Sequence, residues 1–126
     1  MPSSSLVGAW GEEQAARYLR LHGYSIMERN FSCRTGELDI VAKKGKFIVF
    51  AEVKTRKNAK FAEAREFVTY AKQQRIFAAA QMYLTSHDGD LQPRFDVIEV
   101  YAPEGLATKK PELRHWEDAF ESDSFL

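Results

Sequence analysis

The chain has 126 residues, of which 44% are hydrophobic and 29% are charged. This composition predicts one globular domain over residues 1–126 and argues against a disordered or fibrous chain. The 18 basic and 18 acidic side chains cancel, yet residues 1–80 hold 14 basic against 8 acidic ones and residues 81–126 hold 4 against 10. A phosphate-binding face and an acidic tail that merely solvates one end are both compatible with this asymmetry.

Cysteine usage and hydropathy indicate where the protein works. The single cysteine, Cys33, excludes an intrachain disulfide framework and a zinc cluster of several thiolates. The first residues lack the basic and apolar regions of a signal peptide, and no apolar run approaches the length that spans a membrane. We therefore expect a cytoplasmic protein without a membrane partner, and the sequence leaves a homodimer open.

The first predicted element is a helix, which the serines near the start of the chain can cap and Gly23 can end. Small and apolar residues recur at helical spacing, namely Gly8, Gly11, Ala15, Ala16 and Leu19. Glu12 falls on this stripe of small residues. The pattern predicts that its carboxylate faces inward.

A β-hairpin is the firmest structural prediction. Its strands, residues 38–43 and 47–54, are rich in Ile, Val and Phe, and they follow a first strand over residues 24–31 and a turn over residues 32–36. A two-residue loop of Lys44 and Gly45 would join them.

The length of this loop decides where Asp39 points. A loop of two or four residues places Asp39 opposite Phe50, diagonal to Glu52 and on the same face of the sheet. A loop of three residues would pair Asp39 with Ala51 and turn its carboxylate to the other face. The candidate site therefore depends on the register of the hairpin.

The remaining elements complete an α/β fold. Residues 56–60 read as a basic loop, and residues 61–68 are open between a helical turn and an ordered loop. A second helix is predicted from the N-cap Thr69 to a point before Gly89. Strands are predicted over residues 94–101 and, at the sheet edge, 113–116, with a flexible tail over residues 117–126. The order αβββαβ predicts a mixed β-sheet core flanked by helices.

Charged side chains interrupt the apolar hairpin. Glu52 and Lys54 share one face of their strand because side chains alternate. Asp39 and Glu52 together offer the oxygen ligands that Mg²⁺ or Mn²⁺ prefers, and Lys54 could assist an attacking water. Glu12 could bind a second metal or a metal-bound water. The alternative is a buried structural ion pair, although three carboxylates and a lysine exceed what one pair requires.

These residues resemble a known family. Glu12, Asp39 and the run Glu52-Val53-Lys54 resemble the E…D…ExK pattern of the PD-(D/E)xK nuclease superfamily. Residues 8–13, Arg29-Asn30, 36–39 and 50–56 further resemble the bacterial YraN-like family, over nearly the whole chain. The resemblance implies a restriction-endonuclease-like core close to that of archaeal Holliday-junction resolvases, with a divalent metal and DNA as ligands. Leucine stands before Asp39 where the superfamily signature has proline.

Basic residues on either side of the hairpin are candidates for contacts with nucleic acid. These are Arg29, Arg34, Arg56, Lys57, Lys60, Lys72 and Arg75. They could line a salt-dependent phosphate track without sequence specificity, or they could be ordinary solvated cations. Asp96 is predicted to pair with Arg94 or Arg75 rather than to bind a ligand. The three histidines show no spacing typical of a zinc site or a catalytic triad.

Three functions are compatible with these patterns. The first is a metal-dependent endonuclease that hydrolyses DNA, branched or otherwise structured, with Asp39, Glu52, Glu12 and Lys54 as its site. The second is a nucleic-acid-binding module that keeps the nuclease fold with little or no cleavage. The third is a protein-interaction module that uses the acidic C-terminal portion.

Overall fold

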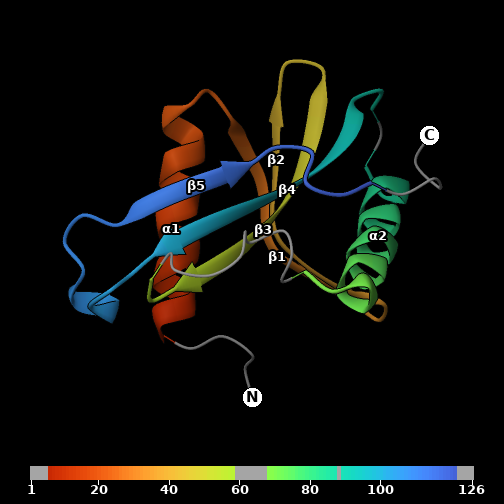
Figure 1. Cartoon of the computed structure of the whole chain (residues 1–126). Helices are drawn as coiled ribbons and strands as arrows, with labels where there is room; N and C mark the ends of the chain where they lie inside the picture. Colours follow the sequence, from red (N-terminus) through yellow and green to blue (C-terminus); the bar gives the residue numbers. More distant parts are fainter. Residues whose placement is uncertain (1–5, 59–67, 88, 122–126) are drawn as a thin grey trace.

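The computed structural model of the chain describes residues 6–58, 68–87 and 89–121. Within these residues, two helices, a short 3₁₀ helix and five strands follow one another (Figure 1). In order they are α1 (Leu6–Leu21), β1 (Ser25–Cys33), β2 (Gly36–Lys44), β3 (Phe47–Arg56), α2 (Tyr70–Thr85), β4 (Gln92–Tyr101), η2 (Gly105–Ala107) and β5 (Glu112–Trp116). The predicted α/β class and order of elements are confirmed.

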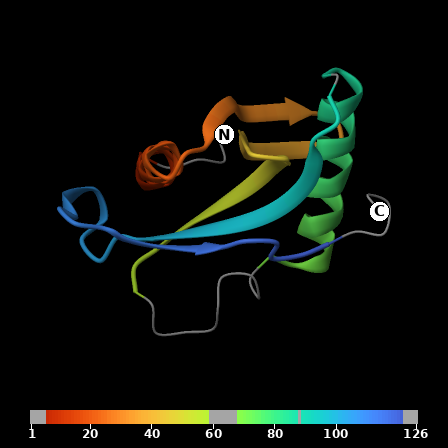
Figure 2. The same cartoon turned by 90° about the horizontal axis from the view of Figure 1, so that it is seen from above.

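The strands form one mixed sheet in the order β1-β2-β3-β4-β5. Strands β3 and β4 are parallel, whereas every other neighbouring pair is antiparallel. A parallel pair needs a long connection, and α2 lies in it. The curved sheet runs between α1 on one face and α2 on the other (Figure 2). No helix within the described residues is long and apolar enough to cross a membrane.

Each face of the sheet has its own hydrophobic cluster. The α2 face is aromatic, with Phe50, Phe77, Tyr83, Phe95 and Phe120 among its buried residues. The α1 face is built from smaller side chains, which lets the helix lie close to the strands. A Cβ atom on Gly11 would overlap the hydroxyl group of Thr55 on β3. The small residues of the first helix therefore set the distance between α1 and the sheet.

The hairpin is present, but its predicted register is wrong by two residues. The loop consists of Gly45 and Lys46, and Val41 rather than Asp39 pairs with Phe50. Gly45 has φ +58°, a conformation that glycine adopts without strain, and this fixes it as the first loop residue. Continuing the ladder beyond its last pair, Ile40 with Ala51, brings Asp39 across from Glu52.

Several boundaries also differ from the prediction. Strand β1 continues to Cys33, so the turn is reduced to Arg34 and Thr35. Phe120, which lies in the stretch predicted as a tail, is buried against Phe77 and Phe95, and residues 122–126 lie outside the described residues. Of the open stretch 61–68 only the buried Val68 is described, and Lys60 also lies outside the described residues.

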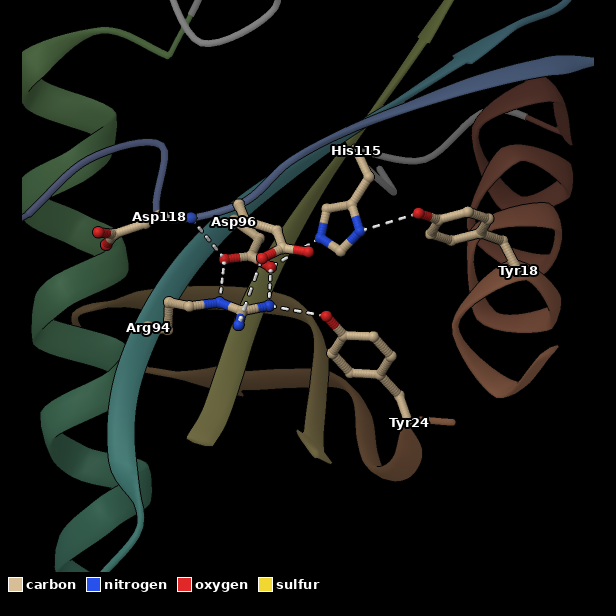
Figure 3. Close-up of polar contacts among 7 residues, drawn as sticks. Tyr18, Tyr24, Arg94, Asp96, His115 and Asp118 are labelled. Atoms are coloured by element: carbon tan, nitrogen blue, oxygen red, sulfur yellow. Dashed lines mark hydrogen bonds and ion pairs between the residues drawn. The ribbon is translucent and has the colours of Figure 1, made fainter. Parts of the chain in front are cut away.

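Asp96 organises a polar network that ties α1 to the sheet (Figure 3). Its carboxylate accepts two hydrogen bonds from Arg94, at 3.0 and 2.7 Å, and one from Nε2 of His115 at 2.7 Å. The other ring nitrogen of His115 lies 3.1 Å from the Tyr18 hydroxyl on α1, and Arg94 also donates to the Tyr24 hydroxyl at 2.8 Å. The predicted pairing of Asp96 with Arg94 is confirmed, whereas Arg75 takes no part.

We expect this network to make folding sensitive to acid. Burial alone would raise the pKa of Asp96, but hydrogen bonds from His115, Arg94 and the Asp118 amide outweigh it and hold the pKa below its usual 3.8. The stabilisation is therefore complete above about pH 4 and is lost as the pH falls further. Asp96→Asn should lower the free energy of unfolding at pH 7 by about 3 kcal/mol. It should also reduce the further loss of stability as the pH falls below 4. Urea unfolding from pH 7 to pH 2 measures both.

The matched control is Asp118→Asn, because Asp118 contributes its backbone amide and not its side chain to the network. Its left-handed φ of +53° is also one that asparagine tolerates. This control should stay within about 0.5 kcal/mol of the native chain. An Asp96→Asn protein as stable as this control would contradict the role assigned to the network.

Candidate metal and active site

The predicted acidic residues lie together in an open cleft of about 340 Å³. Glu12 comes from α1, Asp39 from β2, and Glu52 and Lys54 from β3. They are joined there by Asn30 of β1 and Lys72 of α2. The residues that line the cleft include some from the start of α1, the end of β3 and the start of α2, and these ends lie in the lower half of Figure 1.

Strand β2 departs from regular pairing and alternation next to Asp39. Strict alternation would place Leu38 and Ile40 on one face, yet Leu38 packs in the α2 cluster and Ile40 in the α1 cluster. Beyond Ile40 the ladder with β3 stops. The Asp39 carboxylate accepts the backbone N–H of Val53 at 2.8 Å instead. It is thus held at the edge of β3, beside the carboxylate of Glu52.

The two carboxyl groups are close enough to share a hydrogen bond. Burial raises the pKa of Glu52 to about 7, and the negative charge of Asp39 adds to this effect. Burial also raises the pKa of Asp39, although the hydrogen bond from the Val53 amide opposes the shift. Near neutral pH the pair therefore favours one bound proton or another positive charge.

Two lysines supply part of that charge. Nζ of Lys72 lies 3.4 Å from Oε2 of Glu52, and Nζ of Lys54 lies 3.9 Å from the same oxygen. The sequence predicts Lys54 as part of this site, whereas it predicts Lys72 only as a contact with the phosphates of nucleic acid. Its nearness to Glu52 depends on how α2 is placed over the sheet, which helical spacing does not show.

Glu12 stands at the rim of the acidic pair. It is half-buried, and its pKa is raised by burial and then by the negative charge of Asp39. Asn30 forms a side-chain hydrogen bond with it, and this residue was not among the predicted site residues. Asn30 has φ +55°, a left-handed conformation that asparagine adopts more readily than most residues. The only sequence signal for it is its place in the Arg29-Asn30 motif.

The donor set fits a hard divalent cation. No group of three or more His, Cys, Asp or Glu side chains within residues 6–58, 68–87 and 89–121 is arranged to hold a metal ion. Mg²⁺, however, is commonly held by one or two carboxylates and completes its shell with water and substrate phosphate. A divalent ion between Asp39 and Glu52 would replace the shared proton and supply the positive charge that burial withholds from both carboxylates.

The predicted basic residues divide into two groups. Arg29 pairs with Glu13 at 2.9 Å, and Arg56 lies 3.6 Å from Glu99, whose side chain is 1% exposed. Arg56 thus neutralises the buried carboxylate of Glu99 on β4, which is paired with Lys54 in the sheet. In contrast, Arg34 and Arg75 face a second hollow together with Lys72, and Lys57 is exposed at the end of β3.

The raised pKa of Glu52 predicts a stability that depends on pH and metal. A carboxyl whose pKa rises from 4.5 to about 7 on folding stabilises the protein below pH 4.5, and this contribution is lost as the pH rises through 7. Glu52→Gln keeps a neutral group there. At pH 8 without metal it should therefore be more stable than the native chain by roughly 1 to 2 kcal/mol.

Urea unfolding in a chelator at pH 4.5, 6 and 8 measures this difference. Added Mn²⁺ should stabilise the native chain and leave Glu52→Gln nearly unchanged. Glu112→Gln, at an exposed position on β5, is the matched control and should follow the native chain. A Glu52→Gln protein less stable than the native chain at pH 8 would show that the charged Asp39–Glu52 pair does not destabilise the fold.

Comparison with known proteins places the chain in a family. Residues 11–100 match a family described as "Uncharacterised protein family UPF0102". A UPF0102 protein of Caldanaerobacter subterraneus subsp. tengcongensis is 47% identical over 116 residues, which cover 90% of this chain and 93% of that protein. A UPF0102 protein of Syntrophotalea carbinolica is 44% identical over 120 residues, 94% of either chain. The chain therefore belongs to the UPF0102 family, the YraN-like family that its motifs resemble.

Proposed function

We propose that the protein is a metal-dependent endonuclease that hydrolyses phosphodiester bonds of DNA. The observation that carries the proposal is the meeting of the Asp39 and Glu52 carboxylates in an open cleft, with two lysines beside Glu52. A mixed sheet with helices on both faces is compatible with the restriction-endonuclease-like core that the motifs imply. DNA in the cytoplasm would be the substrate.

Five charged residues of the cleft have a part in the proposed reaction. Asp39 and Glu52 would hold Mg²⁺ or Mn²⁺, and Glu12 would bind through water or at a second ion. The bound ion would polarise the phosphate and lower the pKa of a water molecule. The Lys54 ammonium orients the attacking water and stabilises the negative charge that develops on the phosphate oxygens. Lys72 neutralises Glu52 and lies where it can contact the same phosphate group.

The preference for branched or structured DNA is the part of the proposal that comes from the resemblance to junction resolvases. A panel of duplex, single-stranded, flap and four-way-junction substrates with Mg²⁺ or Mn²⁺ tests it directly. A structured substrate should be cut faster than a duplex of the same sequence.

A second candidate is a module that binds DNA without cleaving it. It is favoured by the lack of a three-ligand cage among the described residues. With two carboxylates as ligands, tight binding of a metal would depend on further ligands from the substrate phosphate. Salt-sensitive DNA binding that is indifferent to metal would support this candidate.

The metal ligands predict one set of results. Asp39→Ala and Glu52→Ala should each abolish measurable Mn²⁺ binding and lower cleavage about 100-fold or more. Calorimetry measures the metal, and circular dichroism checks that the fold is kept. Glu112→Ala, at an exposed position on β5 that does not line the cleft, should change neither quantity. Full cleavage by Glu52→Ala would remove the basis of the proposal.

Lys54 predicts a different result. Lys54→Ala should keep Mn²⁺ binding but lower kcat by about 10²- to 10³-fold, because the ammonium acts on the reacting water and phosphate rather than on the metal. Lys43→Ala, an exposed lysine near the hairpin loop, is the control for simple loss of charge. If Lys54→Ala cleaves as fast as Lys43→Ala, Lys54 has no catalytic part.

A further inference from the structure

A second hollow adjoins the acidic cleft. It has a volume of about 270 Å³ and lies between the turn that joins β1 to β2 and the first turns of α2. Arg34 and Thr35 line it from the turn, and Lys72 and Arg75 line it from α2. Glu37 and Lys72 line both the hollow and the acidic cleft, so the two spaces are adjacent at these side chains.

The walls of this hollow are fixed to each other at Gly36. A Cβ atom at this position would lie 2.7 Å from the backbone oxygen of Arg75, which is closer than real Cβ atoms approach. The backbone of the turn therefore packs directly on α2. As a result, Arg34 and Arg75 are brought to the same hollow although they are far apart in the sequence.

Two of the three cations that line the hollow have no acidic partner among the described residues, whereas the third, Lys72, pairs with Glu52. Arg34 and Arg75 are exposed, and neither forms an ion pair with any acid in the described part of the chain. Other arginines do form such pairs, with Glu13, Glu99, Asp96 and Glu112. Two uncommitted guanidinium groups around one concavity suit a phosphate, whose oxygens accept paired hydrogen bonds from arginine.

We propose that this hollow binds a non-scissile phosphate of the DNA strand whose cleaved phosphate lies in the acidic cleft. The proposal rests on the function proposed above and adds a defined subsite to it. Arg34 and Arg75 contact the non-scissile phosphate, and the Thr35 hydroxyl can donate to it. Lys72 lies between the two phosphates. The substrate strand must then extend past the cleavage point on the side of this hollow.

The experiment measures DNA binding by the full-length chain at several salt concentrations, with Ca²⁺ to prevent cleavage. The variants are Arg34→Gln, Arg75→Gln and the two together. The double variant should bind about tenfold more weakly, and its plot of log K against log salt should be shallower by about one phosphate contact. Arg20→Gln removes an exposed arginine in the last turn of α1 that forms no ion pair with any described residue, and it should leave affinity and slope unchanged.

A chemical probe locates the phosphate. A set of oligonucleotides, each with one neutral methylphosphonate, should contain one position that weakens binding to the native chain about tenfold. The same substitution should change binding to the double variant less than twofold, because the arginines that read that phosphate are gone. If the methylphosphonate weakens binding to the native chain and to the double variant by the same factor at every position, the proposed subsite is wrong.

The results separate this proposal from the proposed hydrolysis. Cleavage that persists while both arginine variants bind like Arg20→Gln keeps the nuclease and removes the subsite. Position-specific binding without metal-dependent cleavage keeps the subsite and removes the nuclease. A chain that binds no DNA at all contradicts both.

Discussion

Two carboxylates held side by side in a largely buried position are the constraint on which the rest of this structure depends. Asp39 and Glu52 repel each other, and burial strengthens the repulsion by removing water. The Val53 amide and two ammonium groups offset part of it. A protein gains little stability from such an arrangement, and this supports the proposal that the pair binds a cation.

The fold meets this constraint with a few local departures from regularity. Strand β2 leaves the ladder at Asp39, so that its carboxylate replaces a strand partner at the Val53 amide. Asn30 takes a left-handed conformation and hydrogen-bonds Glu12. Further along α1, the contact of Tyr18 with His115 ties the helix to the strands and so helps to fix the position of Glu12. The strands and α1 thus hold close together carboxylates whose mutual repulsion would otherwise separate them.

The sequence predicted the order of elements, the hairpin and α2 because alternation and helical spacing are local signals. It also predicted that Asp39 and Glu52 meet, although by the wrong pairing, since a shift of two residues keeps side chains on their faces. The link between Arg56 and Glu99 was not predictable, because it depends on parallel pairing of strands distant in the sequence. The contact of Lys72 with Glu52 and the burial of Phe120 were not predicted for the same reason, because both depend on how the elements pack in three dimensions.

The close contact between Gly11 and Thr55 has a consequence for protein engineering. Replacing a glycine in the middle of a helix by alanine is a common route to greater heat resistance, since it restricts the unfolded chain. In this protein the added methyl group would meet the Thr55 hydroxyl and push α1 away from β3. Glu12 is the next residue and would move with the helix, so a thermostabilising substitution at this position would loosen the cleft it was meant to preserve.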